Sequence, residues 1–411
     1  MPLNEYAAGF GPPSTENGSP ITDTIADPIA DSDRYSRQVL FPGIGPIGQQ
    51  RLAASHAAIV GCGATGAAAA ALLARAGVGT LTLIDRDFVE PSNLHRQILF
   101  DEADAQASLP KAEAARRHIA RFNSRITVHA RIADLVPSNI AELLALATQP
   151  PPQIILDATD NFETRYLIND FAVEQGIPWI YAAAIGASAA TMNILPNPLS
   201  THNSQLTTHN YSPTACLACI FPTPPAGNVE TCDTAGILST AVNLAASIQV
   251  TEALKFLTGQ PNLMRRTLLS FDLWNPALWN PAGHGQSALA GYAHAGHLER
   301  SEIVTGAPRP GCLVCGQRIF THLSGEGRAH ITLCGRDSVQ IHEHHRPVDF
   351  AALRGRLAAH AEIEDLRSND LLLRFRRGPH TLTLFPDGRA IVHGTTDIAL
   401  ARTLYARFVG A

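Results

Sequence analysis

The sequence predicts an α/β protein built on a doubly wound, Rossmann-like sheet with an antiparallel extension, a zinc-clamped loop and a small C-terminal α+β domain. Three observations predict it. Between about 56 and 185, apolar runs typical of buried strands alternate with helical segments. A glycine-rich turn, GCGATG, stands between the first strand and a helix. After about residue 188 this alternation stops, and from about 331 short strands and two helices follow.

The predicted elements of the main part come in a regular order. They are strand, helix and strand over 56–85, helix and strand over 108–132, a buried strand over 152–160, and helix and strand over 161–185. A strand at 190–196, a helix at 236–259 and a strand at 266–275 follow, and the Gly-, Ala-, Pro- and His-rich stretch 276–310 is expected to be a loop.

Three regions differ in composition. Residues 1–32 are rich in Pro, Ser, Gly, Thr and Asp, which predicts a disordered tail. Residues 33–330 form the predicted main domain. Residues 331–411 form a separate small domain with helices at 348–362 and 395–410, short strands within 330–343, 371–378, 380–388 and 389–394, and a Pro-Asp-Gly hairpin turn at 386–388; the sequence assigns this domain no role.

Composition and charge narrow the class of protein. The chain has 411 residues, 45% of them apolar, and a net charge of −5, which argues against a nucleic-acid binder. The N-terminal residues lack the pattern of a signal peptide, and the apolar stretch 57–84 contains Arg75 and several turn-forming glycines, so it does not read as a membrane span. We therefore expect a cytoplasmic protein that binds no membrane, in which paired cysteines favour metal binding or catalysis over disulfides.

The glycine turn has the context of a nucleotide-binding fingerprint. Gly61, Gly63 and Gly66 follow an apolar strand and open an Ala-rich helix, and Asp85 ends the next strand, where an acid can bind ribose hydroxyls. The motif alone fits an NAD dehydrogenase, a flavoprotein or an ATP-dependent enzyme. It also fits a purely structural turn.

The residues that follow favour the use of a polyphosphate. They are polar or charged and stand after predicted strands or at a helix start: Asn93, Arg96, Gln97, Lys111, Asp157 and Asp160. Arg and Lys neutralise phosphate oxygens, and a carboxylate holds Mg²⁺. Taken singly, an arginine or lysine such as Arg96 or Lys111 is more commonly a solvated surface charge, and Asn93 and Gln97 also fit residues that cap or brace the loop. Their combination carries the prediction.

Further motifs appear in a fixed order: RYSRQVL, GCGATG, LIDRDFVEPSNLHRQ, PK, DATDN, CLAC, TCDTAG and CLVC. With these the sequence resembles the MoeB/ThiF/HesA family of adenylyltransferases, relatives of ubiquitin-activating enzymes, over roughly residues 34–320. The resemblance implies that the C-terminal Gly-Gly carboxylate of a ubiquitin-like sulfur carrier attacks the α-phosphate of ATP, which yields an acyl-adenylate and pyrophosphate.

The resemblance also implies a role for each matching residue. Asp85 holds the ribose, and Asp87 of the same motif belongs to the nucleotide-binding set. The residues that contact the triphosphate are Asn93, Arg96, Gln97 and Lys111. Asp160 binds Mg²⁺. Arg37 reaches the active site of a partner subunit as an arginine finger, which requires a homodimer.

The seven cysteines divide into groups by spacing. Cys216, Cys219, Cys312 and Cys315 form two C-x-x-C pairs, which predict a four-thiolate structural Zn²⁺ site; two unrelated redox or buried pairs are the alternative. Cys62 and Cys334 are expected to be packing residues.

Cys232 differs because it stands in a polar loop just before a helix, where a thiol can be reactive. In the family this loop carries a catalytic cysteine in some members, and an exposed spectator thiol is the alternative. His342, His344 and His345 fit a metal site or, more commonly, a solvated strand end.

Three functional hypotheses follow from the sequence. The first is an ATP-dependent enzyme that activates a ubiquitin-like sulfur carrier. The second is an NAD(P)-dependent oxidoreductase. The third is a non-catalytic, zinc-stabilised scaffold that binds the carrier. The sequence does not indicate which carrier or pathway is served.

Overall fold

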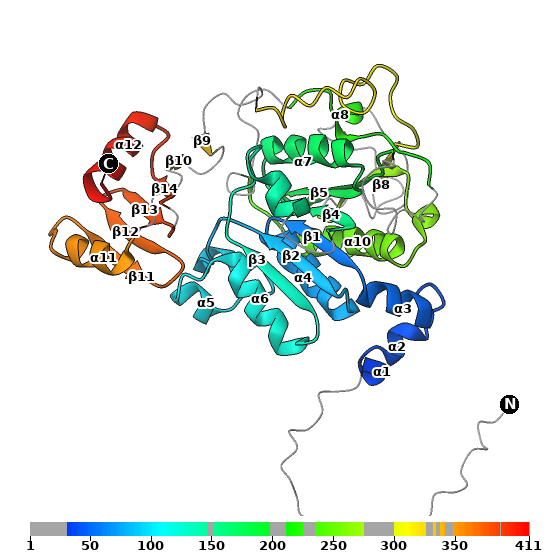
Figure 1. Cartoon of the computed structure of the whole chain (residues 1–411), viewed down its shortest axis with the longest axis horizontal. Helices are drawn as coiled ribbons and strands as arrows, with labels where there is room; N and C mark the ends of the chain where they lie inside the picture. Colours follow the sequence, from blue (N-terminus) through cyan, green and yellow to red (C-terminus); the bar gives the residue numbers. More distant parts are fainter. Residues whose placement is uncertain are drawn as a thin grey trace, which may run out of the picture.

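The computed structural model describes residues 31–146, 151–197, 211–224, 235–274, 300–325, 332–333, 338–341, 348–386 and 388–410 (Figure 1). Apart from 31 and 32, the tail predicted for 1–32 lies outside these residues. So do Cys232, Cys334 and the three histidines at 342, 344 and 345.

An eight-stranded sheet forms the centre of the main part. Its order is β3-β2-β1-β4-β5-β6-β7-β8, with β1–β5 parallel and β6–β8 antiparallel. The strands are β1 (His56–Val60), β2 (Thr80–Ile84), β3 (Thr127–Arg131), β4 (Ile154–Asp157), β5 (Trp179–Ile185), β6 (Ser188–Ile194), β7 (Thr267–Asp272) and β8 (Arg300–Val304). The predicted doubly wound sheet with an antiparallel extension is confirmed.

The strand β8 corrects one prediction. Part of the stretch 276–310, expected to be a loop, pairs with β7, with Leu268 opposite Ile303. The segment is short and lies at the end of the strand order, and Val304 is 79% exposed. It therefore lacks the apolar alternation by which half-buried strands are identified in a sequence.

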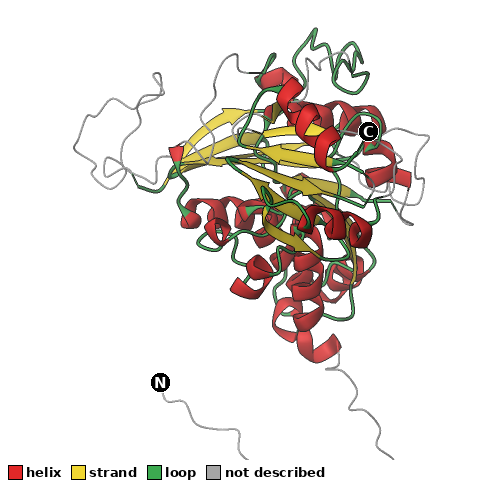
Figure 2. Cartoon of the chain, turned by 90° about the vertical axis from the view of Figure 1, so that its left-hand side faces the viewer, coloured by secondary structure: helices red, strands yellow, loops and turns green. Residues whose placement is uncertain are grey.

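Helices cover both faces of this sheet (Figure 2). One face packs against α4 (Ala64–Ala76), α6 (Lys111–Phe122) and α10 (Ser239–Leu257), and the other against α7 (Phe162–Gln175) and the short α8 (Leu217–Ile220). The run Ala67–Ala70 of α4 is fully buried, because its small side chains let α10 approach closely. The long helix predicted from 236 begins three residues later, at Ser239.

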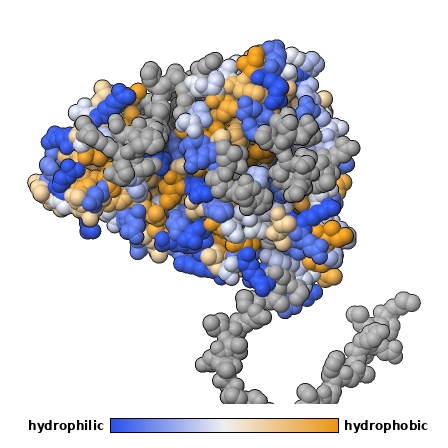
Figure 3. Space-filling model, viewed as in Figure 1, coloured by the Kyte–Doolittle hydropathy of each residue, from blue (hydrophilic) through white to orange (hydrophobic). Residues whose placement is uncertain are grey.

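Shorter helical segments lie around this core. They are α1 (Asp31–Arg34), α2 (Ser36–Val39), α3 (Gly45–Ala53), α5 (Glu102–Gln106), the 3₁₀ turns η1 (Pro91–Asn93) and η3 (Pro261–Leu263), and the π turn η2 (Glu142–Leu146). Among the described helices, none is both long and apolar enough to cross a bilayer. On the face shown in Figure 3, hydrophilic and hydrophobic residues mix in small patches.

The C-terminal part has its own sheet and its own apolar core. The sheet order is β11-β12-β13-β14-β10-β9, and the core gathers side chains such as Phe375, Leu382 and Leu404. Its elements are β9 (Thr332–Leu333), β10 (Ser338–Ile341), α11 (Phe350–Ala358), β11 (Glu364–Ser368), β12 (Leu373–Arg377), β13 (His380–Leu384), β14 (Ala390–His393) and α12 (Ile398–Phe408). The predicted hairpin is confirmed, since Gly388 has a φ of +90° between β13 and β14. Strand β11 was not predicted.

The separate cores support the 33–330 and 331–411 domain division that we propose.

The strand order indicates where a ligand can bind. The chain runs outward from β1 to β2 and β3 on one side, and from β4 to β5 on the other. In open parallel sheets, ligands bind at the carboxyl ends of the strands where the order reverses. Here that point lies between the ends of β1 and β4, which are followed by GCGATG and DATDN.

Candidate nucleotide site and cysteine cluster

The glycine turn joins β1 to α4 and leaves open space at its middle glycine. Gly61 has a φ of +92°, and a Cβ there would stand 2.5 Å from the Ala158 carbonyl oxygen. A Cβ on Gly66 would stand 1.8 Å from the Gly61 oxygen, so both glycines are required for the turn to close. A Cβ on Gly63 would meet nothing within 4 Å. The backbone at Gly63 can therefore be approached by a phosphate group at the start of α4.

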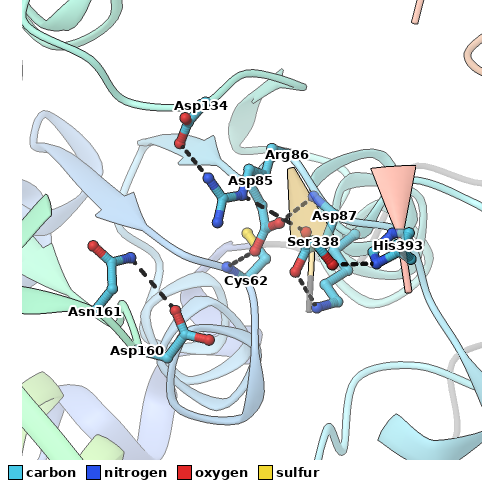
Figure 4. Close-up of polar contacts among 10 residues, drawn as sticks. Cys62, Asp85, Arg86, Asp87, Asp134, Asp160, Asn161, Ser338 and His393 are labelled. Carbon is cyan, nitrogen blue, oxygen red and sulfur yellow. Dashed lines mark hydrogen bonds and ion pairs between the residues drawn. The ribbon is translucent and has the colours of Figure 1, made fainter. Parts of the chain in front are cut away.

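Asp85 is held rigidly at the end of β2. Its Oδ2 accepts a hydrogen bond from the Cys62 N–H at 2.5 Å, and its Oδ1 accepts one from the Asp87 N–H at 2.7 Å (Figure 4). Burial raises the pKa of Asp85, and the Lys111 ammonium opposes that rise. Each carboxylate oxygen has further acceptor capacity, so the group can still receive ribose hydroxyls.

Lys111 begins α6 and is almost completely buried. Its Nζ lies 3.2 Å from Asp87 Oδ2, and its backbone N–H donates to the Asp87 carbonyl at 2.8 Å. Only 2% of Lys111 is exposed. A buried ammonium requires a negative partner, and Asp87 supplies one that a phosphate can replace. The structure thus brings Asp85, Asp87 and Lys111 together.

The turn η1 positions Asn93 and Gln97. Asn93 Oδ1 accepts from the Glu90 N–H at 3.1 Å, the Asn93 N–H donates to the Glu90 carbonyl at 2.9 Å, and the Gln97 N–H donates to the Asn93 carbonyl at 2.9 Å. Both side chains are buried, and Gln97 Oε1 has no hydrogen-bond partner among the described residues. An orphaned buried amide oxygen fits a site that is completed by a ligand.

Arg96 contacts its own loop. Its Nη1 donates to the Ser92 carbonyl at 2.8 Å, so the side chain folds back on its own loop. A contact with phosphate would require the guanidinium to leave that carbonyl.

The two aspartates after β4 have different environments. Asp157 is fully buried, 3.2 Å from the Nε of Arg165, and its Oδ1 accepts from the Thr159 N–H at 2.9 Å and from the Thr159 hydroxyl at 2.7 Å. Asp160 is exposed, directly before Asn161, which caps α7. Figure 4 shows Asp160 on the opposite side of Cys62 from Asp85 and Asp87. Asp157 is therefore paired in the interior, whereas Asp160 lies at the surface beside the turn, where Asn161 Nδ2 donates to its Oδ1 at 3.5 Å.

Sequence reasoning did not single out Arg165. It is buried on α7 and also donates to the carbonyls of Thr159 at 2.6 Å and Ala182 at 3.2 Å, so it holds the loop that presents Asp160. The available signal was the single basic residue of a helix that follows a buried aspartate.

Arg37 lies away from these residues. The neighbouring Gln38 donates to the Ala76 carbonyl at 2.8 Å, at the last turn of α4, whereas the glycine turn precedes the first. Thirteen helical residues span about 20 Å. Figure 1 also places α1–α3 and the C-terminal sheet on opposite sides of the main sheet. The exposed Arg37 is therefore not brought to the nucleotide turn within one subunit.

The four predicted zinc ligands meet in one cluster on the α7 face of the sheet. Their Sγ atoms all lie within 4.8 Å of one another. The separations are 3.7 Å from Cys216 to Cys219, 3.7 Å from Cys216 to Cys312, and 3.3 Å from Cys219 to Cys315. A tetrahedral site with Zn–S bonds of about 2.3 Å has sulfur atoms about 3.8 Å apart. The donor set and its spacing fit Zn²⁺.

The surroundings of the cluster also suit a bound cation. The pKa of Cys216 is raised, and the hydrogen bond with Cys219 is the largest cause. Thiols packed this closely cannot all ionise without a positive charge between them. The Arg309 N–H donates to Cys219 Sγ at 3.2 Å. The Leu217 N–H donates to Asn169 Oδ1 at 2.9 Å, which ties α8 to α7.

Of the remaining three cysteines, the structure describes Cys62 but neither Cys232 nor Cys334. Cys62 is fully buried in the main core, as predicted. Cys232 lies outside the described residues. The segment just after it is anchored at the carboxyl end of β5, where the Gly186 N–H donates to the Gly236 carbonyl at 3.0 Å and the Leu238 N–H donates to the Gly186 carbonyl at 2.8 Å.

Comparison with known proteins identifies relatives along most of the chain. The pattern described as the ThiF family matches residues 35–286. The chain is 40% identical over 380 residues to the sulfur carrier protein ThiS adenylyltransferase of Bacillus subtilis, which covers 92% of this chain and 99% of that protein. It is 35% identical over 241 residues to a sulfur carrier protein adenylyltransferase of Thermus thermophilus, which covers 58% of this chain and 83% of that protein.

Solved structures support the fold. The crystal structure of E. coli MccB with ATP aligns with a TM-score of 0.51 and 21% identity over 69% of this chain and 74% of that one. A second MccB structure aligns with a TM-score of 0.53 and 20% identity over 74% of this chain and 76% of that one.

Proposed function

The chain belongs to the ThiF family and is an adenylyltransferase, and we propose that it activates the C-terminal Gly-Gly carboxylate of a ubiquitin-like sulfur carrier with ATP. The family assignment decides between the enzyme classes that the sequence left open, in favour of the adenylyltransferase over the oxidoreductase. The carrier is proposed because the two relatives above are named for sulfur carriers.

One observation carries the assignment of the site. A buried ammonium (Lys111), a rigidly held, half-buried carboxylate (Asp85) and a buried amide oxygen without a described partner (Gln97) all lie in segments that follow the open backbone of Gly63 in the sequence. In the proposed complex Asp85 binds the ribose. Asn93, Gln97, Lys111 and a reoriented Arg96 contact the triphosphate. Asp160 supplies a carboxylate to Mg²⁺, which neutralises charge on the phosphates when bound.

The chemistry then follows from positioning and charge. A carboxylate oxygen of the carrier attacks the α-phosphorus, a new P–O bond forms, and the bond from that phosphorus to the bridging oxygen of pyrophosphate breaks. Negative charge grows on the departing pyrophosphate, and the buried Lys111 lies in a site of low dielectric where its charge acts strongly. No thiol takes part in this step.

A homodimer is also proposed. Arg37 cannot reach the nucleotide turn of its own subunit, so a role as an arginine finger requires a second copy. Exposed apolar side chains stand close to Arg37 in the sequence: Leu40 is 72%, Phe41 61% and Ile47 67% exposed. Their exposure supports a contact surface here. The four-cysteine cluster is proposed to hold Zn²⁺ as a structural ion, because four thiolates leave no open position for substrate.

Carrier-dependent ATP–pyrophosphate exchange tests the proposal. We expect the purified protein to exchange labelled pyrophosphate into ATP only when Mg²⁺ and a sulfur carrier ending in Gly-Gly are present. The matched control is the same carrier without its last glycine, which should support little exchange. Equal exchange with both carriers would contradict the assigned substrate. Lack of pyrophosphate release with any carrier would favour the non-catalytic scaffold.

A further inference from the structure

The C-terminal sheet contacts the main part at a few defined places. Arg374 on β12 lies with its Nη2 3.5 Å from Glu90 Oε1, and its guanidinium stands 4.5 Å from the centre of the Phe88 ring. His393 on β14 meets the same ring edge-on, with ring centres 6.5 Å apart. Arg389 donates to the Ile132 carbonyl at 2.8 Å, just after β3. Figure 1 shows this sheet beside α5 and β3.

These contacts fall on the segment that carries the proposed nucleotide residues. Phe88 follows Asp87, the partner of Lys111. Glu90 holds Asn93 through both its backbone N–H and its carbonyl. Figure 4 shows Ser338 and His393 of the C-terminal sheet beside Asp87, and the Ser338 hydroxyl lies 2.8 Å from His393 Nδ1. The segment from Asp87 to Asn93 is therefore held from the side of the C-terminal sheet.

Arg374 is suited to hold this segment. Phe88 is 5% exposed, and the guanidinium covers its face while pairing with Glu90 two residues later. A planar guanidinium can stack on a ring and pair with a carboxylate at once, which an ammonium does less well. One side chain of the C-terminal sheet thus contacts two residues of the nucleotide segment, one of which fixes Asn93.

We propose that the C-terminal domain is a positioning element for the ATP site, and that Arg374 is its main positioning residue. By pairing with Glu90 and covering Phe88, Arg374 keeps the 87–93 segment in the arrangement that binds the nucleotide. Arg374 itself contacts no substrate. The inference rests on the proposed use of ATP, and it gives the 331–411 domain a role in nucleotide affinity.

The test compares ATP affinity in variants on both sides of the contact. Titration calorimetry with ATP and Mg²⁺ needs no carrier, and exchange assays add KM for ATP and for the carrier. Arg374→Ala and Glu90→Gln should each raise the Kd and KM for ATP about 3–10-fold, with the KM for the carrier unchanged. The double variant should be no worse than the weaker-binding single variant, because both remove one interaction. Arg374→Lys should restore part of the affinity.

Arg376→Ala is the matched control. Arg376 lies on the same strand two residues later and pairs with Glu364 inside its own sheet, so its loss should change ATP affinity less than twofold. If Arg374→Ala does not fold, Glu90→Gln and Arg374→Lys carry the test, since each keeps the size of its side chain nearly unchanged. An ATP Kd within twofold of wild type in folded Arg374→Ala, or in Glu90→Gln where Arg374→Ala does not fold, would overturn the inference but not the proposed function. Absence of ATP binding by the wild-type protein would overturn both.

Discussion

The proposed ATP site lies at the carboxyl ends of the parallel strands, which we call the nucleotide edge, and its side chains come from segments that follow β1, β2 and β4. The cysteine cluster instead joins two C-x-x-C pairs that are 96 residues apart in the sequence. The first is open at Gly63, and its exposed Asp160 faces solvent. The second is nearly closed, with three of its four cysteines buried. Changes at the nucleotide edge should therefore reduce catalysis with little loss of stability, and changes at the cysteine cluster should reduce stability with little loss of catalysis.

The largest effect is expected at Asp160. Asp160→Ala should lower ATP–pyrophosphate exchange by about 10²–10³-fold, because a positioned metal ion supplies several kcal/mol of charge stabilisation. The thermal midpoint should stay close to that of wild type, since the side chain is exposed. Exchange kinetics and thermal denaturation check both expectations. Near-normal exchange would remove Asp160 from the site.

Arg37 tests whether the nucleotide edge is completed by a second subunit. Arg37→Ala and Lys111→Ala should each lower exchange by about 10²-fold. Mixed and re-equilibrated, they should recover about one quarter of wild-type activity, because half of randomly paired dimers contain one intact site. The control is each variant mixed with itself. No recovery after confirmed subunit exchange would contradict an arginine supplied by the partner.

Metal removal tests the other half of the comparison. Zinc should be present at about one ion per chain, and stripping it should lower the thermal midpoint by at least about 5 °C. The Kd for ATP should change much less, because the cluster lies on the α7 face, apart from the glycine turn. Metal analysis and calorimetry measure both quantities. Protein purified without chelator that contains no zinc would overturn the structural-ion assignment.

Asp170 on α7 links the stability of the cluster face to pH. Its Oδ2 accepts from the His322 N–H at 2.9 Å, so it holds the segment that follows Cys315. Burial raises the pKa of Asp170 from 3.8 to about 6. Between these values the folded protein binds more protons than the unfolded one, so this group makes stability fall as pH rises from about 4 to 6.

Asp170→Asn should remove that dependence. Relative to wild type, the variant should gain on the order of 2 kcal/mol in free energy of unfolding between pH 4 and pH 7, as measured by denaturant unfolding across that range. Asp365→Asn, at an exposed carboxylate of the C-terminal sheet, is the control. A constant difference between Asp170→Asn and wild type would show that the carboxylate is not perturbed.

Cys232 should have no effect on the first chemical step. Cys232→Ala should keep pyrophosphate exchange within about twofold of wild type, since carboxylate attack on phosphorus needs no thiol. A covalent enzyme–carrier adduct formed after adenylation should be absent from this variant. Intact-protein mass spectrometry with ATP and carrier, with and without a sulfur donor, looks for it. An adduct that persists in the variant would assign the bond to another residue.

The alternation of strands and helices in the sequence predicted the sheet and the strand ends at which the proposed nucleotide residues lie. Parallel strands place their carboxyl ends at one edge, so Gly61, Asp85 and Asp160 had to lie near one another once the alternation of strand and helix was recognised. The C-x-x-C pairs likewise predicted a cluster that the structure forms. Strands β8 and β11 escaped prediction because short edge strands lack apolar alternation.

Which polar residues are buried depends on the packing of the folded chain. The aspartates of DATDN look equivalent in sequence, but burial against Arg165 uses Asp157 and leaves Asp160 at the surface. Similarly, nothing local predicts that Arg374 would reach Glu90, because the two residues are far apart in the chain and meet only when two separate sheets pack together. Local patterns report periodicity and turn chemistry, whereas contacts between distant segments depend on how the folded units dock.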